Sequence, residues 1–389
     1  MNVPKLRFKE FNDEWISQKL FQLVEFSKGN ILAKADLDET GNYPCILYGQ
    51  LYTKYNEVIR EIYSKTNRNE NNIPKSKRGD ILIPSSGETP IDISTSSCIQ
   101  IDNVLLGGDI NILRPISCDG RFLSYLINNN KKTEIAKLAQ GHSVVHLYND
   151  NLKQVSINIP SIQEQKRISD TLELLDKKIE LQSKKIEDLK LFKLYTENSL
   201  LNSSNSIHWK KLKLNDILVE GNKKPVKNTN DFKKITIKLN LNGLEFNESK
   251  REMSDKRPFY IREENEIIIG KQNYFNGSIA IVTKEFSGCI CSNAIMSFKV
   301  KEGYNLKYIY LYLSQKRYMK EREFLANGTG QKELSEKEFL KFTIKVPEDS
   351  VVNNITNIID KINKKINFEN NKLNKLIELK KGLMQNMFV

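Results

Sequence analysis

The sequence has 389 residues, with 61 Lys and Arg against 48 Asp and Glu, which gives a formal charge of +13 at pH 7. This length exceeds what one ordinary hydrophobic core serves and predicts two or three domains, while 17 Phe and 15 Tyr exclude a disordered chain. The positive excess favours a polyanionic partner, usually nucleic acid in a cytosolic protein, and leaves a merely basic, solvated surface as the alternative.

The composition also indicates the cellular compartment. No apolar run approaches the roughly 18 uncharged residues that a membrane span needs, and the first 15 residues contain six charged side chains, so we expect neither a secretory signal nor an anchor. The five cysteines lack CxxC spacing, which argues against a disulfide frame and a zinc ribbon (Cys45, Cys98, Cys118, Cys289 and Cys291). We therefore expect a cytoplasmic protein.

The chain contains one pattern twice. The Gly loop at residues 139–141 and the apolar series that ends at Pro160 recur at residues 326–328 and at Pro347, always 187 residues later. Upstream, the two tryptophans of the chain, Trp15 and Trp209, lie 194 residues apart and are followed by matching apolar residues. The segments between these anchors differ, so two copies of one unit with different interiors indicate two related tasks on two different targets.

Each copy predicts the same elements in chain order. A first strand next to the tryptophan is followed by a region of short strands, a Gly loop, a strand that ends in proline and a long helix. Among the short strands, residues 81–83 follow the turn Arg78-Gly79-Asp80, and residues 267–269 precede Gly270.

The long helices have a heptad pattern. Ser161 with Glu164 is a capping box, and apolar residues then recur at steps of three and four, with Gln182 and Glu369 as matched polar interruptions. The predicted pairing residues are Ile168, Leu172, Leu175, Ile179, Ile186 and Leu189 in the first helix and Ile355, Ile359, Ile362, Ile366, Leu373 and Leu376 in the second.

So narrow an apolar strip predicts one partner helix. Because the first helix leads from copy one to copy two, and the second leaves copy two at the equivalent point, we expect an antiparallel pair; packing of each helix on its own domain is the alternative. A helix of about 38 residues is about 57 Å long, equivalent to about 17 base pairs.

Motifs for catalysis are absent from the sequence. It has no GxxxxGK[ST] loop, no strand-led GxGxxG and no Asn-Pro-Pro or Asp-Pro-Pro motif before an aromatic residue. His142 and His146 are four residues apart without a nearby third ligand, and Cys289 and Cys291 alternate in a predicted strand as core residues. We predict no catalytic residue, no metal site and no cofactor in this chain.

Three segments resemble a known family. Residues 4–8 and 14–15 (Pro-Lys-Leu-Arg-Phe and Glu-Trp), residues 159–165 with Ile159-Pro160 and Gln163-Glu164-Gln165, and residues 379–388 (Leu-Lys-Lys-Gly-Leu-Met-Gln-Asn-Met-Phe) resemble the specificity subunits of Type I restriction-modification enzymes. The duplicated layout is also similar, over the whole chain. One departure is that residues 191–195 match the Leu-Lys-Lys-Gly segment poorly.

The resemblance implies an α+β fold. Two pseudo-twofold-related target-recognition domains, each a mixed, mostly antiparallel sheet with helices, would be joined by two long antiparallel coiled-coil helices. The expected boundaries are 1–160 and 203–348 for the two domains, 161–202 for the central helix and 349–389 for the C-terminal helix.

The resemblance also implies the partners. Each domain would read one half-site of a bipartite double-stranded DNA target, and two methyltransferase subunits would dock on the helices and supply S-adenosylmethionine and adenine methylation. Two restriction subunits would supply ATP- and Mg-dependent translocation and cleavage in phage defence. The chain itself would be a non-catalytic subunit.

Base readout requires Arg or Lys for guanine, Asn or Gln for adenine, and adaptable hydroxyl groups, displayed on loops of a rigid sheet. In copy one, residues 48–55 interleave aromatic, amide and basic groups, residues 85–89 follow a strand, and residues 140–143 form the Gly loop. The candidates are Tyr48, Gln50, Tyr52, Thr53, Lys54, Tyr55, Ser85, Ser86, Glu88, Gln140 and His142. Ordinary surface turns are the alternative.

In copy two, the loop at 270–277 corresponds to the loop after residue 84, and residues 327–332 form the second Gly loop. The candidates are Lys271, Gln272, Asn273, Tyr274, Asn276, Asn327, Thr329, Gln331 and Lys332. Residues 210–238 hold nine lysines, which suggests phosphate contacts or a solvated face.

Two other classes stay open. A non-catalytic coiled-coil adaptor would bind proteins through its two heads, and a nuclease or methyltransferase acting alone would bind metal or S-adenosylmethionine itself. The absence of catalytic motifs disfavours the second class.

Overall fold

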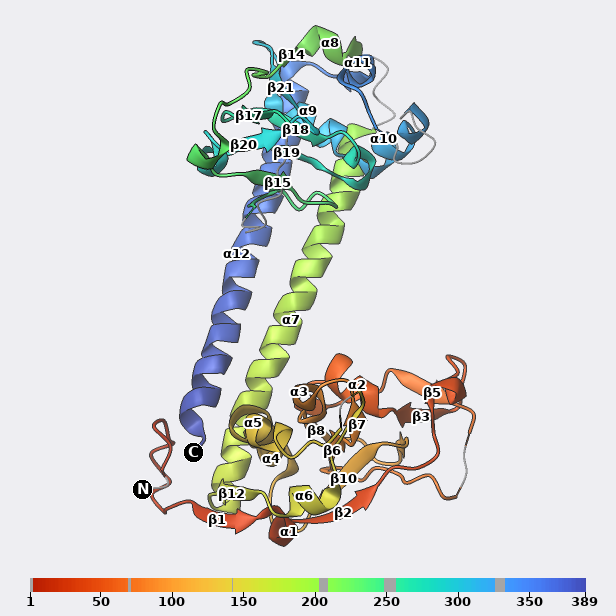
Figure 1. Ribbon diagram of the computed structural model, residues 1–389, viewed down its shortest axis with the longest axis vertical. Coiled ribbons are helices and arrows are strands. Elements are labelled where there is room, and N and C mark those ends of the chain that lie inside the picture. Colours follow the sequence, from red (N-terminus) through yellow and green to blue (C-terminus); the bar gives the residue numbers. More distant parts are fainter. Residues whose placement is uncertain (1–2, 69–70, 142, 203–208, 248–256, 326–332) are drawn as a thin grey trace. The chain divides into compact units, whose positions relative to one another are not determined.

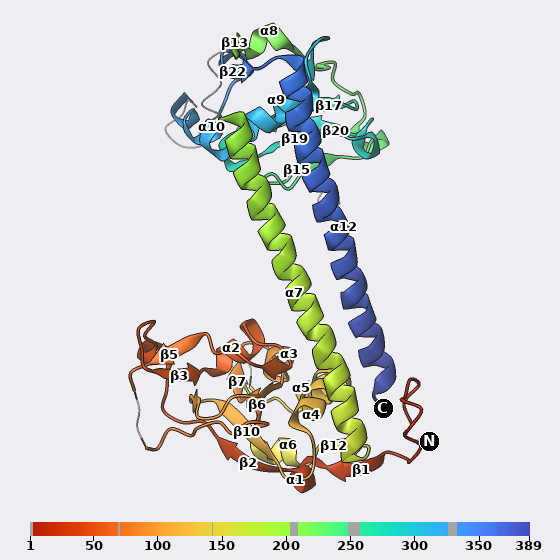
Figure 2. The same ribbon diagram turned by 180° about the vertical axis from the view of Figure 1, so that it is seen from behind.

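The computed structural model describes all residues except 1–2, 69–70, 142, 203–208, 248–256 and 326–332. The chain divides into two compact units, of which unit 1 comprises residues 1–185 and 369–389 and unit 2 comprises residues 186–368. Figures 1 and 2 show the two long helices, α7 (Ile162–Leu201) and α12 (Asp349–Met387), and each of them contributes residues to both units. No helix within the described ranges is both long and apolar enough to cross a membrane.

Unit 1 is built on a sheet in the order β2-β10-β6-β8-β4, next to a smaller sheet β5-β3-β9 and the pairs β1-β12 and β7-β11. Its strands are β1 (Ile16–Lys19), β2 (Val24–Lys28), β3 (Tyr43–Ile46), β4 (Val58–Ile59), β5 (Ser64–Thr66), β6 (Ile81–Pro84), β7 (Ser86–Gly87), β8 (Ser97–Ile99), β9 (Leu105–Leu106), β10 (Ile110–Pro115), β11 (Val145–His146) and β12 (Ser156–Ile159). Its shorter helices and helical turns are α1 (Leu20–Leu23), η1 (Lys34–Asp36), α2 (Tyr48–Thr53), α3 (Pro90–Ile93), α4 (Gly120–Leu126), η2 (Ile127–Lys131), α5 (Lys132–Ala136) and α6 (Asn149–Lys153).

Unit 2 is built on the sheet β14-β21-β18-β19 with the pairs β13-β22, β15-β16 and β17-β20. Its strands are β13 (Lys210–Lys213), β14 (Leu218–Glu220), β15 (Ile235–Ile237), β16 (Leu244–Phe246), β17 (Phe259–Ile261), β18 (Ile267–Gly270), β19 (Ile279–Ile281), β20 (Ile290–Ser292), β21 (Ile295–Val300) and β22 (Thr343–Val346). Its shorter helices and turns are α8 (Leu214–Ile217), η4 (Thr229–Asp231), η5 (Tyr274–Asn276), η6 (Lys284–Phe286), α9 (Leu306–Leu313), α10 (Lys316–Lys320), η7 (Glu323–Leu325) and α11 (Glu336–Leu340).

The central strand of each sheet is continuously apolar because both of its faces are covered. In β6, Ile81, Leu82 and Ile83 are completely buried, and alternate residues face different clusters: Ile81 and Ile83 belong to one and Leu82 to another. The same division occurs in β18, where Ile268 belongs to a different cluster from its neighbours. Burying one such side chain contributes about 1.5–3 kcal/mol, so these strands anchor each sheet.

The repeat seen in the sequence recurs in the strand pairing. The strand beside Trp15 pairs antiparallel with the strand that ends before Pro160, with Ile16 opposite Ile159. The strand beside Trp209 pairs in the same way in unit 2, with Lys210 opposite Val346. Most pairs are antiparallel, and β3-β9 and β4-β8 are parallel. The predicted α+β class with two sheet-rich units and two long helices is therefore confirmed.

The sequence left two alternatives for the apolar residues of the long helices, contact with the other helix or packing on a domain. Both occur in the structure. Ile168 and Leu172 of α7 lie in the core of unit 1, together with Met384 and Met387 of α12. In unit 2, Ile355 and Ile359 of α12 lie in the core, together with Leu201 of α7. The first two positions of each series thus pack into a domain core as well as near the other helix. Further along, Ile179 and Leu189 are only half-buried.

Within unit 1 the helices run antiparallel. The amide Nε2 of Gln182 donates to the carbonyl oxygen of Glu369 at 3.0 Å and to its carboxylate Oε2 at 2.7 Å, and the Lys380 ammonium pairs with Asp176 at 2.7 Å. Since the residue numbers rise on one helix as they fall on the other, the helices have opposite directions. Gln182 and Glu369 are equivalent positions of the repeat, and they contact one another in a buried polar layer.

Candidate nucleic-acid interface

In both units the loop that follows the central strand is joined to the segment after the Gly loop. The amide of Leu147 donates to the carbonyl of Ser85 at 3.0 Å, and the amide of Leu334 donates to the carbonyl of Lys271 at 2.9 Å. These two hydrogen bonds are equivalent in the repeat. In each unit, the structure therefore joins the candidate loop after the central strand to the residues that follow the Gly loop.

In unit 1 these segments form a small polar surface whose exposed residues are Glu88 and Gln140, while Ser85 and Ser86 are only 8% and 4% exposed. Ser86 and Gly87 in β7 pair with His146 and Val145 in β11, and the Ser86 hydroxyl lies 2.9 Å from Nδ1 of His146. Gln140 is exposed and exchanges two backbone hydrogen bonds with His146. Glu88 follows as an exposed residue. The imidazole and the amide are groups that can contact base edges or phosphate.

Residues 48–53 form the helix α2 and not a loop, and this helix lies beside the same surface. A Cβ atom added at Gly87 would lie in ordinary contact with the ring of Tyr52, at 3.8 Å, but only 2.5 Å from Cγ2 of Ile93, so Ile93 leaves room only for glycine there. Burial raises the pKa of Tyr52, with further contributions from Tyr48, Glu88 and Asp92. Tyr48 and Tyr52 are half-buried, and Thr53 and Lys54 at the end of the helix are exposed.

Five of the predicted DNA contacts are buried: Ser85, Ser86, Gln50, Tyr55 and Tyr274. Gln50 is 8% exposed, and its amide bonds to the Ser64 hydroxyl and to the backbone of Leu47. Tyr55 is 8% exposed, and its hydroxyl accepts a hydrogen bond from the amide of Tyr63.

Tyr274 is completely buried and donates its hydroxyl to the carbonyl of Leu313. The side chains of Gln50, Tyr55 and Tyr274 therefore stabilise the fold, because a base could reach them only after their internal hydrogen bonds had broken.

The loop of unit 2 presents its polar groups on a short turn. Gln272, Asn273 and Asn276 are exposed, and Asn276 donates to the side chain of Asn273 at 3.2 Å. The turn closes at Gly277, whose φ of 77° favours glycine. Lys271 at the start of the loop is largely covered and lies 3.7 Å from the carboxylate of Glu336. His142, Asn327, Thr329, Gln331 and Lys332 lie outside the described residues.

A cleft in unit 2 contains charged residues that sequence reasoning did not select. It has a volume of about 650 Å³, and Lys271 lines it together with Lys223, Arg262 and Glu336. Lys223 belongs to the lysine-rich segment that the sequence marked, whereas Arg262 and Glu336 carried no signal in the pattern. Burial lowers the pKa of Lys223, but its hydrogen bonds to Glu220 and Glu336 raise it overall, so the ammonium is charged at neutral pH.

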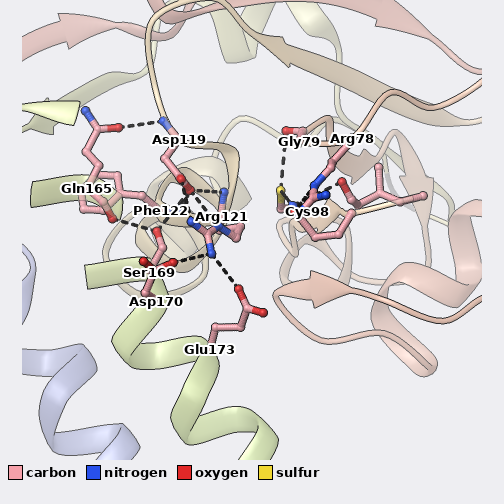
Figure 3. A network of polar contacts seen from close by, with 12 residues as sticks. Arg78, Gly79, Cys98, Asp119, Arg121, Phe122, Gln165, Ser169, Asp170 and Glu173 are labelled. Atoms are coloured by element: carbon pink, nitrogen blue, oxygen red, sulfur yellow. Dashed lines mark hydrogen bonds and ion pairs between the residues drawn. The ribbon is translucent and has the colours of Figure 1, made fainter. Parts of the chain in front are cut away.

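A polar network fixes unit 1's sheet domain to α7, as Figure 3 shows. Arg121 bonds to Asp119 at its own helix start and to Asp170 and Glu173 on α7, at 2.7–3.0 Å. The backbone amide of Asp119 also donates to the side chain of Gln165 on α7 at 2.9 Å. Bidentate and shared guanidinium bonds of this kind hold planar groups in a defined orientation.

A second cluster ties the same domain to both helices. Lys380 on α12 pairs with Asp176 on α7 and with Glu57 at 3.0 Å, and the Tyr125 hydroxyl donates to Asp176 at 2.6 Å. Burial raises the pKa of Asp176, while Lys380 lowers it. Glu57 follows α2 in the chain, so this cluster supports the segment that carries Tyr52 and Lys54.

The thiols and carboxylates form no reactive centre in the part of the chain that is described. No group of three or more His, Cys, Asp or Glu residues there could hold a metal ion. Burial raises the pKa of Cys45 to about 11 and that of Cys98 to about 12. Cys289 and Cys291 lie in an apolar cluster, where burial also raises their pKa. These thiols are protonated at neutral pH and are core residues.

Comparisons with known proteins agree with this architecture. Residues 12–191 and 206–379 each match the Type I restriction modification DNA specificity domain. The putative type I restriction enzyme specificity subunit S.HindORF215P of Haemophilus influenzae is 30% identical over 190 residues, which are 44% of this chain and 45% of that protein. The chain thus matches less than half the length of this curated relative.

Two solved structures have a similar fold. The S subunit of a Type-I restriction-modification system from M. genitalium has a TM-score of 0.64 at 17% identity, over 100% of this chain and 99% of that one. A chain from a structural study of complex assembly and conformational transition of the type I R-M system has a TM-score of 0.54 at 12% identity, over 96% and 97%. The chain therefore belongs to the family of Type I restriction modification DNA specificity domains, of which it contains two copies.

Proposed function

We propose that this protein is the DNA sequence-specificity subunit of a Type I restriction-modification complex. Each sheet-rich domain would read one half-site of a bipartite duplex target. The observation that carries this proposal is a backbone contact that both units repeat, between the candidate loop after the central strand and the segment that follows the Gly loop: Leu147 to Ser85 in unit 1 and Leu334 to Lys271 in unit 2. The backbone frame is the same, but the displayed side chains differ, as two different half-sites require.

The long helices would set the gap between the half-sites. The helix α7 has 40 residues, which corresponds to a length of about 60 Å or about 18 base pairs of duplex. The contact between Gln182 and Glu369, equivalent positions of the repeat, supports a local twofold axis between the helices. A polar pair in an otherwise apolar seam specifies helix register, because any shift leaves a buried charge unpaired.

The helices also offer two equivalent docking faces for a partner. In unit 1, Leu181 and Leu379 are more than half exposed, and in unit 2 the equivalent residues Phe368 and Phe192 are exposed to a similar extent. Large apolar side chains that stay exposed at repeated positions are typical of protein interfaces. We infer two copies of a methyltransferase subunit, one on each face.

Catalysis would reside in the partners. The methyltransferase subunits would bind S-adenosylmethionine and methylate adenine, and two restriction subunits would use ATP and Mg²⁺. The protein described here would contribute recognition and geometry, in a cytoplasmic complex.

The test is co-expression with the methyltransferase subunit in a host without Type I systems, followed by sequencing of methylated adenine. The expected product is methylation at a bipartite site with a fixed gap. Methylation at a short contiguous site would refute the proposal. An adaptor that binds only proteins would give no methylation and no salt-sensitive gel shift with duplex DNA.

The helical gap has its own test. Removal of one heptad from the segment 168–189 shortens the helix by about 10 Å, which is about 3 base pairs, and the matching heptad is removed from α12 to retain the pairing. The methylated site should keep both half-sites and show a shorter gap. An unchanged gap in the folded variant would show that the helices do not set it.

A further inference from the structure

The cleft of unit 2 lies beside the loop that follows β18, a candidate DNA-contacting segment, and beside the start of α11. Lys271, the first residue of the loop after β18, forms part of one wall, and Glu333, Ser335, Glu336 and Lys337, which follow the second Gly loop, form another. Lys223, after β14, completes the rim. At the inner end, Arg262 is 2% exposed, and its Nη1 donates to the carbonyl of Asn222 at 3.0 Å.

One carboxylate occupies the centre of the positive groups. Glu336 forms an ion pair with Lys223, whose ammonium also pairs with Glu220 at 2.8 Å. The other oxygen of Glu336 lies 3.7 Å from the ammonium of Lys271. A carboxylate between two ammonium groups occupies the position in which a phosphate would be held, because both are oxyanions that accept hydrogen bonds from lysine.

Unit 1 has the same backbone at this place without the charges. Asn149 begins α6 as Glu336 begins α11, 187 residues later in the repeat. The Asn149 amide donates to the carbonyl of Ser27 at 3.1 Å. Ser85 and Gly29 occupy the positions that correspond to Lys271 and Lys223. The carboxylate with its two lysines is therefore a property of unit 2, beyond what the shared frame requires.

We propose that Lys223 and Lys271 form a binding site for one phosphodiester group of the DNA backbone, and that Glu336 occupies this site until DNA displaces it. This inference rests on the proposed function and deepens it by naming a backbone contact in the second recognition domain. The carboxylate competes with every phosphate, so a duplex gains this contact only where its other contacts with unit 2 hold the phosphate in place. Glu336 therefore weakens binding to non-cognate DNA more than binding to the cognate site.

The experiment measures DNA affinity of the complex with its methyltransferase subunits, for a cognate and a non-cognate duplex, at several salt concentrations. E336Q removes the competing charge and should bind the non-cognate duplex about fivefold more tightly, with a smaller gain for the cognate duplex. The double variant K223Q/K271Q should bind more weakly, with the slope of log K against log salt reduced by about 0.9, the value for one phosphate.

K224Q is the matched control. Lys224 is the exposed neighbour of Lys223 and does not line the cleft. Loss of its charge should leave the slope and the preference for cognate DNA nearly unchanged. Thermal unfolding of each variant checks that α11 and the sheet remain intact.

Three outcomes would overturn the inference. An unchanged slope in K223Q/K271Q would show that no phosphate binds there. An E336Q variant that loses cognate affinity would indicate that the carboxylate accepts a hydrogen bond from a base. A slope reduced equally by K224Q would indicate diffuse attraction.

If the wild-type complex bound no duplex at all, the proposed function would fail as well. Specific binding by the wild type, with the same affinities and slopes in the variants, would refute this inference alone.

Discussion

At equivalent positions of the repeat, unit 1 has a buried ion pair where unit 2 has an apolar contact. In unit 1, Arg7 makes a bidentate ion pair with Glu164, which is 1% exposed at the start of α7. The equivalent positions of unit 2 are Leu201 and Val351, and both belong to one apolar cluster. The shared backbone therefore accommodates either an ion pair or two apolar residues, provided that both residues are replaced together.

A second pair of equivalent positions differs in the same way. Asp80 is buried and binds Arg114 through two hydrogen bonds of 2.8 Å. Glu266, its equivalent, is completely buried, accepts from the Ser297 hydroxyl, and lies 3.9 Å from the ammonium of Lys299. Its Oε1 has no hydrogen-bond partner within the described residues. The carboxylate is held more firmly in unit 1, because the guanidinium matches both of its oxygens.

The two sheet domains are also attached to the long helices by different contacts. Arg121 bonds to Asp170 and Glu173 in unit 1, whereas the equivalent Lys307 pairs only with Asp360 among the ion pairs described for unit 2. Lys380 joins α12 to α7 and to the bend at Glu57 in unit 1, while its equivalent Lys193 pairs with Glu197 on the same helix at 3.6 Å. Attachment in unit 1 depends more on charge, and attachment in unit 2 depends more on apolar contacts.

The largest expected effect comes from exchanging the interior of one unit. Replacement of residues 16–155 by the corresponding segment of another specificity subunit should change the first half-site completely and leave the second one and the gap unchanged. Sequencing of methylated DNA measures all three. A change in both half-sites would show that the units do not read DNA independently.

The Arg7 to Glu164 pair gives the next largest effect. Arg7→Ala leaves the buried carboxylate without its cation and should lower the free energy of unfolding by about 3 kcal/mol. The double variant R7L/E164V, which copies the residues of unit 2, should recover most of this loss. Urea unfolding of both variants provides the measurement. A double variant as unstable as R7A would mean that the two solutions are not interchangeable.

Removal of Lys380 should have a smaller and pH-dependent effect. Lys380→Met leaves Asp176 and Glu57 without their shared cation, which costs about 2 kcal/mol at neutral pH. The pKa of Asp176 is already raised by burial, and loss of the ammonium raises it further. A raised carboxyl pKa in the folded state adds stability at low pH, and this contribution is lost as the pH rises through that pKa.

The K380M variant should therefore recover stability relative to wild type as the pH falls from 7 towards the raised pKa of Asp176. Unfolding midpoints at several pH values test this, with the exposed neighbour Lys381→Met as the control. A constant difference at every pH would show that Asp176 does not titrate in this range.

The exposed pair in unit 2 should matter least. Lys307→Met breaks the contact with Asp360, and both side chains are at least one-third exposed, so the free energy of unfolding should fall by about 0.5 kcal/mol. The equivalent change in unit 1, Arg121→Met, should cost several times more because the Arg121 side chain is only 18% exposed and pairs with three carboxylates. If both variants lowered the free energy of unfolding equally, charge would contribute no more to the attachment in unit 1 than in unit 2.

Part of the candidate site was accessible from the sequence. The loops after β6 and β18 were located from a strand followed by turn residues, and the repeat showed that these two loops are equivalent. The burial of Gln50 and Tyr274 was not accessible, because the local sequence of an amide or a phenol is the same whether the group faces solvent or forms a hydrogen bond inside the fold. Glu336 was also missed, since its charge is one of many on exposed helix starts.

The sequence by itself determined the duplication, the strands at 81–83 and 267–269, and the two long helices with their matched polar positions Gln182 and Glu369. These features are periodic and local, so spacing alone specifies them. Only the tertiary structure decided that the equivalent polar residues contact one another, that Ile168 and Ile355 belong to domain cores, and that Glu336 lies between Lys223 and Lys271. Those contacts join residues far apart in the chain, and their energies depend on burial and on exact partners that no periodicity encodes.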